Sequence, residues 1–137
     1  MANDFTLSVV APDRSVAEDQ IVSVVAPGAE GYFGVLAGHV PLIAALKPGI
    51  LEYQDVHGQR HFIYAGGGFA EVTASRVTVL ADEAARAQDI DVSEAERRLD
   101  DARNVLRGGP GSVDTEHAIL ELDRAIARLR AARLNER

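Results

Sequence analysis

The chain changes its hydrophobic periodicity near Asp89, and this change constrains the fold more than any other feature. Before Asp89, apolar residues occur in short runs separated by turn residues such as Pro12-Asp13 and Pro27-Gly28. After Asp89 they recur every three or four residues, which is the period of an amphipathic helix. Because one regular architecture cannot satisfy both periods, we expect an α+β chain in two parts, residues 1–86 and 87–137.

The first part is predicted to be a β-sandwich, or flattened barrel. Phe5, Leu7 and Val9 alternate with polar residues, which is the period of a half-buried strand. Similar runs follow at close spacing with no helical period between them, at residues 21–26, 49–54, 60–65, 68–72 and 76–80. Short strands in such number favour a sandwich. Between two of these runs, Gly66-Gly67-Gly68 is expected to form a bulge or tight bend.

The second part is predicted to be an antiparallel hairpin of two helices. The first helix begins near Asp91. Asp91 with Glu94 and Ser93 with Glu96 both have the form of a capping box, so its exact first residue stays open, and it ends at the glycine-rich residues 108–111. Ser112 or Asp114 caps the second helix. The expected apolar stripes are Val92, Ala95, Leu99, Ala102 and Leu106 on the first helix and Ile119, Leu122, Ile126 and Leu129 on the second, with Ala118, Ala125 and Ala132 beside them.

A two-helix unit of this size buries too little apolar area to be stable alone. It therefore needs the sandwich or a partner surface, and we expect its docking to be reversible. A permanently docked hairpin is the alternative.

Composition excludes several classes of function. The formal net charge is -7 and aromatic residues make up only 5% of the chain, so nucleic-acid binding is not expected. The absence of cysteine excludes disulfides and thiolate metal sites. No apolar run is long enough to span a bilayer, and the N-terminal residues do not resemble a signal peptide. A bacterial cytoplasmic location is the expectation.

Motifs that carry chemistry are scarce. His57 and His61 lie four residues apart, but on a predicted strand hairpin this spacing does not favour a metal site over exposed turn histidines. The sequence contains no GxxxxGK[ST] or GxSxG motif and no clear pair of buried carboxylates. We expect no catalytic residues, no metal and no cofactor. A metal enzyme that uses His57 and His61 is the most distant alternative.

Positive charge collects at the C-terminal end. Residues 124–137 contain five arginines against Glu136 alone. These arginines suit either a solvated helix C-terminus or the bidentate recognition of an acidic protein partner.

The segment Pro27 to Ile43, PGAEGYFGVLAGHVPLI, closely resembles the signature of the ε subunit of bacterial F-type ATP synthases, the δ subunit in mitochondria. Further matching segments follow the family order and spacing over the whole chain: Val10 to Asp13, Leu46 to Gly49, Gly66 to Val72, Val77 to Asp82 and Asp89 to Asp91.

The resemblance implies a non-catalytic rotor subunit of the proton-translocating synthase, with the fold predicted above. It implies that the sandwich couples the rotation of the γ subunit to the membrane c-ring, so that the chain is peripheral to the cytoplasmic face of the bacterial plasma membrane and meets the membrane only through the complex. The positions that the resemblance assigns to rotor contacts are Glu30, Gly31, Phe33, Gly34, His39 and Pro41.

The resemblance also implies a regulatory hairpin. When compact it lies on the sandwich, and when extended its second helix reaches the α and β subunits of the catalytic head and opposes ATP hydrolysis. The head presents an acidic segment there, and the candidate inhibitory contacts are Arg124, Arg128, Arg130 and Arg133.

Some family members bind ATP on the folded hairpin through an IDxxRA motif. This chain has Ile90, Asp91 and Ala95 of that motif, but Glu94 replaces its arginine. Arg124 and Arg128 match the basic positions of the second helix, whereas Asp101 stands where the first helix would supply another arginine. Because acidic groups repel a polyphosphate, we predict weak or absent ATP affinity.

A second class of function stays open on the residues alone. The chain could be a free-standing β-sandwich adaptor whose helical hairpin binds an acidic protein partner. Co-purification with γ separates the two hypotheses, because the adaptor predicts none.

Overall fold

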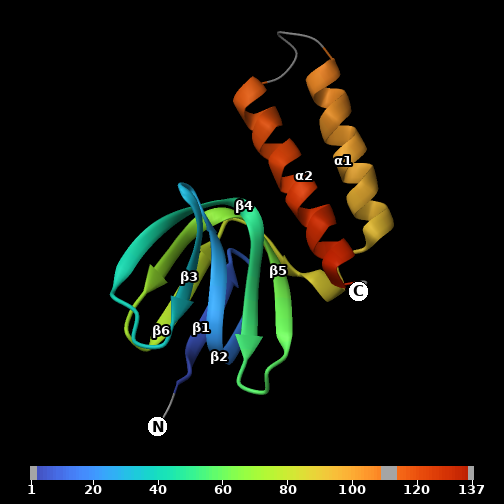
Figure 1. Ribbon diagram of the computed structural model, residues 1–137. Helices are drawn as coiled ribbons and strands as arrows, with labels where there is room; N and C mark the ends of the chain where they lie inside the picture. Colours follow the sequence, from blue (N-terminus) through green and yellow to red (C-terminus); the bar gives the residue numbers. More distant parts are fainter. Residues whose placement is uncertain (1–2, 109–113, 136–137) are drawn as a thin grey trace.

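The computed structural model describes residues 3–108 and 114–135, and these form a β-sandwich followed by two helices (Figure 1). This is the predicted fold class. In chain order the elements are β1 (Phe5–Ala11), β2 (Arg14–Gly28), β3 (Gly31–Leu36), β4 (Leu42–Asp55), β5 (Arg60–Val72), β6 (Arg76–Ala81), β7 (Ala84–Arg86), the 3-10 turn η1 (Ala87–Asp89), α1 (Val92–Arg107) and α2 (Thr115–Asn135).

The strands form one sheet that folds back on itself. Its order is β1-β6-β5-β4-β2-β3, and β1 also pairs with β2, which closes the sheet into a flattened barrel. All pairings are antiparallel except that of β1 with β6. Closure leaves few free strand edges, and β3 forms the edge at one end of this order.

The strands are longer than the sequence pattern predicts. Residues 60–65 and 68–72 were expected as two strands, but they form the single strand β5. Residues 31–36 were not among the predicted strands, and they form β3, paired with β2. Glycines at positions 31 and 34 weaken the strand pattern there, although the alternation of buried Val35 with exposed neighbours is clear in the structure.

The interior of the sandwich is aliphatic. The alternating residues Phe5, Leu7 and Val9 of β1 are all buried, as their period predicts. They pack in one cluster with the inward residues of the other strands, including Leu51, Ile63 and Val79. This cluster gives the strands a fixed register, because a slip by one residue would turn the apolar side chains outward.

The three glycines of β5 form the bend that the sequence predicts. Gly67 and Gly68 have φ angles of 101° and 128°, a region that favours glycine. A Cβ atom on Gly68 would lie 2.1 Å from the carbonyl oxygen of Leu80. At this bend β5 changes partner, pairing with β7 before it and with β6 after it.

Both helices begin at aspartate caps. Asp91 accepts a hydrogen bond from the backbone N–H of Glu94, 3.2 Å away, as the capping box predicts. Asp114 accepts from the backbone N–H groups of Glu116 and His117 at 3.0 and 3.4 Å. The other candidate cap, Ser112, and most of the glycine-rich turn lie outside the described residues.

The apolar stripe of α2 differs from the expectation. Ile119 and Ile126, which were placed in the seam, are 48% and 38% exposed. The buried positions are mainly alanines, namely Ala118, Ala125, Ala127, Ala131 and Ala132, together with Leu129. Because α2 packs on both α1 and the sheet, its closest contacts use the smallest side chains, and the branched residues turn outward.

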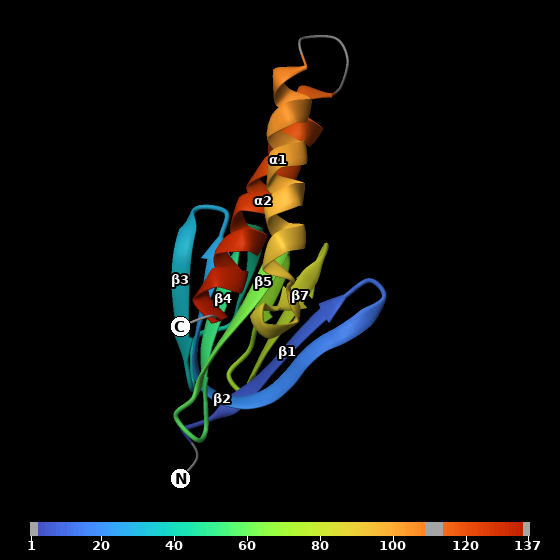
Figure 2. The ribbon, with the colours of Figure 1, turned by 90° about the vertical axis from the view of Figure 1, so that its right-hand side faces the viewer.

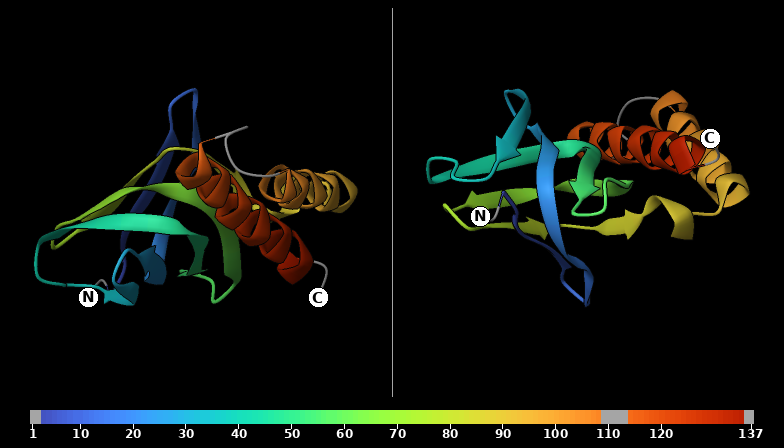
Figure 3. Two further views of the ribbon diagram at one scale, coloured as in Figure 1. Left: turned by 90° about the horizontal axis from the view of Figure 1, so that it is seen from above. Right: turned by 60° about the horizontal axis from the view of Figure 1, so that its bottom comes forward.

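The second helix connects the hairpin to the sandwich. Seen from above, α2 lies against β4 and β5, and α1 lies on the far side of α2 (Figure 3). Ile50 and Tyr64 of the sheet, Ala87 and Ile90 of the connection, and the buried face of α2 form a second apolar cluster. The structure therefore shows the compact arrangement of the hairpin.

Substitution of Gly68 tests the glycine bend. We expect Gly68→Ala to lower the free energy of unfolding by about 2 kcal/mol or more, because the methyl group meets the Leu80 carbonyl and the φ angle disfavours it. Urea denaturation measures the change. Gly34→Ala is the matched control, since its new methyl group would meet no atom closer than 3.9 Å. Equal stability of both variants would contradict the constraint.

Candidate functional site

An exposed apolar row crosses the sheet. Ala45 of β4 pairs with Phe69 of β5, which pairs with Leu80 of β6, and Leu80 pairs with Val10 of β1. Phe69 and Leu80 are 57% and 56% exposed, and neighbouring Ile43 is 74% exposed. We call the surface formed by Ile43, Ala45, Phe69 and Leu80 the sheet face. Contiguous large apolar side chains on a surface typically mark an interaction site.

The sheet face adjoins the turn between β2 and β3. Glu30, Gly31 and Phe33 line an open cavity of about 510 Å³ together with Ile43 and Ala45. Three of the six predicted rotor contacts thus lie beside the sheet face. The other three do not line this cavity: Gly34 lies on β3, and His39 and Pro41 lie in the loop between β3 and β4.

Sequence reasoning missed Phe69 and Leu80. The signal was available in the alternation of buried and exposed positions along their strands. Ala70 and Val72 of β5 are buried, which turns Phe69 outward, and Leu80 lies between the buried residues Val79 and Ala81 of β6. A large apolar residue at an outward position is the feature that would have identified them.

Arg124 joins α2 to the bend of β5. Its Nε donates a hydrogen bond to the Gly66 carbonyl oxygen at 3.0 Å. Its two Nη atoms lie 2.9 Å from Glu121 and 3.8 Å from Asp82. The Arg124 side chain is only 17% exposed, whereas Asp82 and Glu121 are 62% and 45% exposed.

Arg128 occupies the next turn of α2. Its guanidinium lies 5.6 Å from the centre of the Tyr64 ring, within the range of a cation–π contact. The Tyr64 hydroxyl donates to Glu83. Burial, followed by the hydrogen bond to Glu83, raises the pKa of Tyr64 far above its usual value, so the phenol stays protonated. These two contacts link Arg128 of α2 to Tyr64 and Glu83 of the sandwich.

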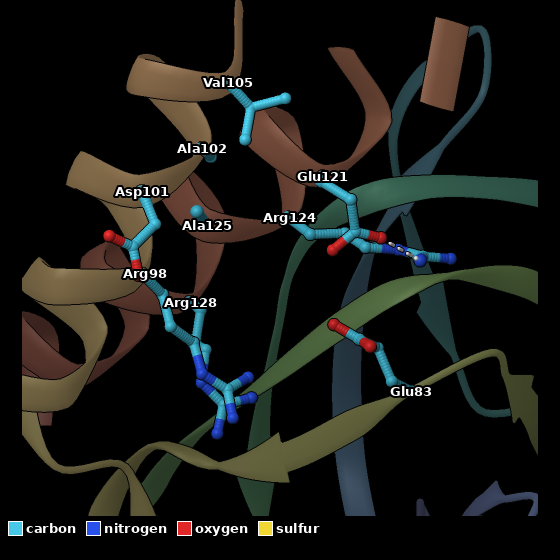
Figure 4. Close-up of a pocket in the computed structure, with 9 residues that line it drawn as sticks. All are labelled: Glu83, Arg98, Asp101, Ala102, Val105, Glu121, Arg124, Ala125 and Arg128. Carbon is cyan, nitrogen blue, oxygen red and sulfur yellow. Dashed lines mark hydrogen bonds and ion pairs between the residues drawn. The ribbon is translucent and has the colours of Figure 1, made fainter. Parts of the chain in front are cut away.

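A cavity of about 330 Å³ opens between the two helices and the sandwich (Figure 4). Figure 4 shows Arg98 on α1 and Arg128 on α2, with Glu83 extending from the sandwich. Its charged lining consists of Arg98, Arg124 and Arg128 against Glu83, Asp101 and Glu121. Equal numbers of the two signs leave little net attraction for a polyphosphate.

The remnants of the ATP motif have structural roles. Ile90 and Ala95 are buried in the second apolar cluster, and Asp91 caps α1. Glu94, which replaces the arginine of the motif, forms an ion pair with Arg98 at 3.0 Å. None of these four residues lines the cavity of Figure 4. The low ATP affinity stays a prediction, and these placements support it.

Within the described part of the chain, the last two candidate arginines, Arg130 and Arg133, form no ion pair with the sandwich. Arg133 lies 3.3 Å from Glu96 of α1, and both side chains are more than half exposed. Arg130 is exposed. The four candidate inhibitory residues are therefore divided, with Arg124 and Arg128 held at the junction and Arg130 and Arg133 accessible.

The two neighbouring histidines do not come together as a metal site. His61 Nε2 lies 2.8 Å from Asp55 and its ring stacks on Tyr53 with centroids 4.7 Å apart, while His57 is exposed in the turn. Among residues 3–108 and 114–135 no group of three possible ligands is close enough to hold a metal. Within the same residues, neither helix is both long and apolar enough to cross a membrane.

Both parts of the chain match models of one family. Residues 4–87 match the beta-sandwich domain of the ATP synthase Delta/Epsilon chain, and residues 88–133 match its long alpha-helix domain. The chain belongs to the ATP synthase delta/epsilon family. A delta/epsilon chain is a stalk subunit of ATP synthase and not a catalytic one, and the resemblance found in the sequence is confirmed.

Relatives in this family align over nearly the whole chain. Two proteins named ATP synthase epsilon chain, from Nitratidesulfovibrio vulgaris strains DP4 and Hildenborough, are each 43% identical over 130 residues. The alignment covers 95% of this chain and 96% of each relative.

Two solved structures have a similar fold. One is a chain of Euglena gracilis mitochondrial ATP synthase, in a cryo-EM structure of OSCP, F1 and the c-ring. Its TM-score is 0.80 and its sequence identity is 26%, and the match covers 96% of this chain and 82% of that chain. The other is from the central stalk and c-ring of Tetrahymena thermophila mitochondrial ATP synthase, with a TM-score of 0.62 and 12% identity over 93% and 96%. The second shows the fold alone.

The Asp55 carboxylate gives this delta/epsilon chain a testable pH dependence. The hydrogen bond with His61 lowers the pKa of Asp55 below its usual value, and the backbone N–H groups of Gln59 and His57 add to this effect. A carboxyl whose pKa is lowered by folding stabilises the fold at pH values above its pKa in the unfolded chain, which is about 3.9. This contribution is lost as the pH falls through the pKa of the folded chain.

We therefore expect Asp55→Asn to lower the urea midpoint at neutral pH, and the difference from the native chain to shrink below about pH 4. Urea titrations over a pH series measure this. Asp13→Asn, at an exposed turn, is the control. A difference that stays constant with pH would contradict the role of the carboxylate charge.

Proposed function

We propose that this chain couples the γ subunit to the c-ring in the rotor of ATP synthase, with the sheet face as its dock on γ. The exposure of Ile43, Phe69 and Leu80 carries this proposal, because a stalk subunit needs an apolar surface that a permanent partner covers. Family membership supports the rotor subunit over the free-standing adaptor.

The turn at Glu30 is the proposed contact with the c-ring. Glu30 and Gly31 are exposed, and Gly31 has a φ of 134°, which a residue with a side chain adopts poorly. The Euglena structure, which contains a chain similar to this one, includes a c-ring, and this supports a position beside a c-ring. Through such contacts the chain would be peripheral to the cytoplasmic face of the membrane, held there by the complex.

Substitution of Phe69 tests the dock on γ. We expect Phe69→Glu to weaken co-purification with γ by about tenfold or more, since a buried charge would replace an apolar anchor. Its thermal unfolding should change little, because the side chain is exposed in the free chain.

Val56→Glu is the matched control, since Val56 is 45% exposed in the turn between β4 and β5, away from the sheet face. Retention of γ by the Phe69 variant would contradict the assignment of the sheet face. Loss of γ in both variants would do the same.

We further propose that the hairpin inhibits ATP hydrolysis when it leaves the sandwich. The structure supports a separable unit, because α2 provides the main contacts with β4 and β5 and α1 packs on α2. The side of α2 that packs on the sheet consists mainly of alanines, whose short side chains insert little between the side chains of the sheet. An equilibrium between compact and extended forms then depends on a difference of a few kcal/mol, which contacts with the head can reverse.

The arginines of α2 would change partners in this transition. In the compact form Arg124 bonds the Gly66 carbonyl and Arg128 covers Tyr64, so extension must break both contacts. Arg130 and Arg133 lose little on extension, since they lie largely in solvent. Contact of all four arginines with acidic groups of the α and β subunits would compensate for the lost junction.

Removal of the hairpin tests the inhibition. A chain that ends at Gln88 should leave synthase assembly intact and raise ATP hydrolysis by the assembled enzyme, by about fivefold or more for a coupling of this kind. Unchanged hydrolysis would contradict the inhibitory role.

A full-length pair tests the arginines themselves. Arg130→Ala with Arg133→Ala should raise hydrolysis in part, because these side chains contribute little to the compact form. Arg97→Ala with Arg107→Ala removes the same charge from exposed positions of α1 and should have no effect. Equal hydrolysis by both variants would overturn the arginine mechanism.

A further inference from the structure

A groove follows α2 on a different side from Arg124 and Arg128. Two open cavities, of about 280 and 420 Å³, share the side chains of Ile126 and Arg130. Sandwich residues bound the first cavity and α1 bounds the second. We call their joint surface the groove face, formed by Tyr32, Lys47, Leu99, Arg103, Ile126, Leu129, Arg130, Arg133 and Leu134.

The groove face joins four elements, two from the sandwich and two from the hairpin. In Figure 2 the C-terminal half of α2 lies between β3 and α1. Tyr32 belongs to β3, Lys47 to β4 and Arg103 to α1. The surface therefore exists only while the hairpin is folded and docked on the sandwich.

The chemistry of the groove face is apolar at its floor and cationic at its rim. The floor contains leucines 99, 129 and 134, with Ile126 and the half-exposed Tyr32 ring. The rim carries Lys47, Arg103, Arg130 and Arg133. Two carboxylates oppose them, Asp123 in the first cavity and Glu96, which pairs with Arg133.

Most of the cations on the rim are available to a partner. Among residues 3–108 and 114–135, Arg103 and Arg130 form no ion pair. The Lys47 ammonium lies 6.0 Å from the centre of the Tyr32 ring and not against a carboxylate of the described chain. The groove face thus presents a local excess of positive charge on a chain whose overall charge is -7.

We propose that the groove face binds an acidic amphipathic helix of a partner protein. Apolar residues of such a helix would fill the floor, and its glutamates or aspartates would meet the rim, which is the pattern of helix-in-groove recognition. Arginine pairs carboxylates in two-point contacts, and complementary charge gives the encounter its specificity.

Binding at the groove face favours the compact form. A ligand shifts a conformational equilibrium toward the state that it binds better, and the groove face is absent from any form in which α2 has left the sheet. The partner helix would therefore oppose extension of the hairpin. This last step rests on the proposed inhibitory function, whereas binding itself does not.

The first experiment measures binding by the isolated full-length chain. The probe is a dye-labelled synthetic peptide with leucines on one helical face and glutamates on the other, followed by fluorescence anisotropy. We expect Lys47→Glu with Arg103→Glu to weaken binding by about tenfold or more. Neither residue belongs to the proposed inhibitory set, so this result is independent of ATP hydrolysis.

Arg97→Glu with Arg107→Glu is the matched control, because it makes the same charge change at exposed positions outside both cavities. It should retain binding within about twofold. Equal weakening by both pairs, or equal binding of a peptide with lysine in place of glutamate, would overturn the proposal.

A second pair of variants tests the apolar floor. Ile126→Asn should weaken peptide binding, whereas Ile119→Asn should not, although both isoleucines are exposed on α2. Ile119 lines neither cavity. Equal binding by all three chains would show that only charge attracts the peptide and would overturn the groove.

The effect on conformation is measured with spin labels on Ser75→Cys and Asn104→Cys, since the native chain contains no cysteine. Peptide should sharpen the distance distribution at the separation of the compact form. A shift to longer distances would overturn the preference for that form.

Other occupants of the groove face give different results. Vesicles of phosphatidylglycerol that bind the native chain but not the Lys47 and Arg103 variant, with no binding of the peptide, would assign the groove face to a membrane. Self-association that this variant abolishes, again without peptide binding, would assign it to a second copy of the chain. Either result would overturn the proposal.

Discussion

The bend of β5 determines how the two parts of this chain fit together. At Gly66, Gly67 and Gly68 the strand leaves β7 and joins β6, and the φ angles of Gly67 and Gly68 lie in a region that favours glycine. The same bend presents the Gly66 carbonyl oxygen to Arg124 of α2. One local constraint therefore supports both the closure of the barrel and the docking of the hairpin.

The cations of the hairpin region serve different surfaces although they lie close together in the sequence. Arg124 and Arg128 face the sandwich, where Gly66 and Tyr64 hold them. Arg130 lies on another side of the helix, within the groove face. The helical period of 3.6 residues produces this division, because a shift of two positions turns a side chain to nearly the opposite face. Net charge and composition do not reveal it.

The sequence predicted the fold because strong local signals agreed with the tertiary structure. Alternation at Phe5, Leu7 and Val9 located β1, and the two candidate capping boxes, at Asp91 and Ser93, located the region where α1 begins. The exceptions depend on long-range packing. The residues near Ile126 in the sequence do not indicate that its side chain faces outward, because its exposure depends on how closely α2 packs on the sheet. The Arg124 contact with Gly66 spans 58 residues of sequence and is visible only in the folded chain.

The candidate docking surface was likewise predicted only in part. The family signature drew attention to Glu30 and Phe33, and both lie beside the sheet face. Phe69 and Leu80 complete that surface through strand pairing, which the signature does not describe. Recognition of a family thus located one edge of the surface, and the register of the strands supplied the remainder.

The alanine face of α2 also bears on the solubility of the chain. A helix that detaches from a core of leucine and phenylalanine exposes a large apolar area and tends to aggregate. Ala118, Ala125 and Ala132 would each expose little more than a methyl group. The larger residues Ile119 and Ile126 are already in contact with water in the docked form. Detachment would still expose Leu129 of α2 and Ile50 and Tyr64 of the sheet, so the alanines limit the apolar area that opening adds without removing it.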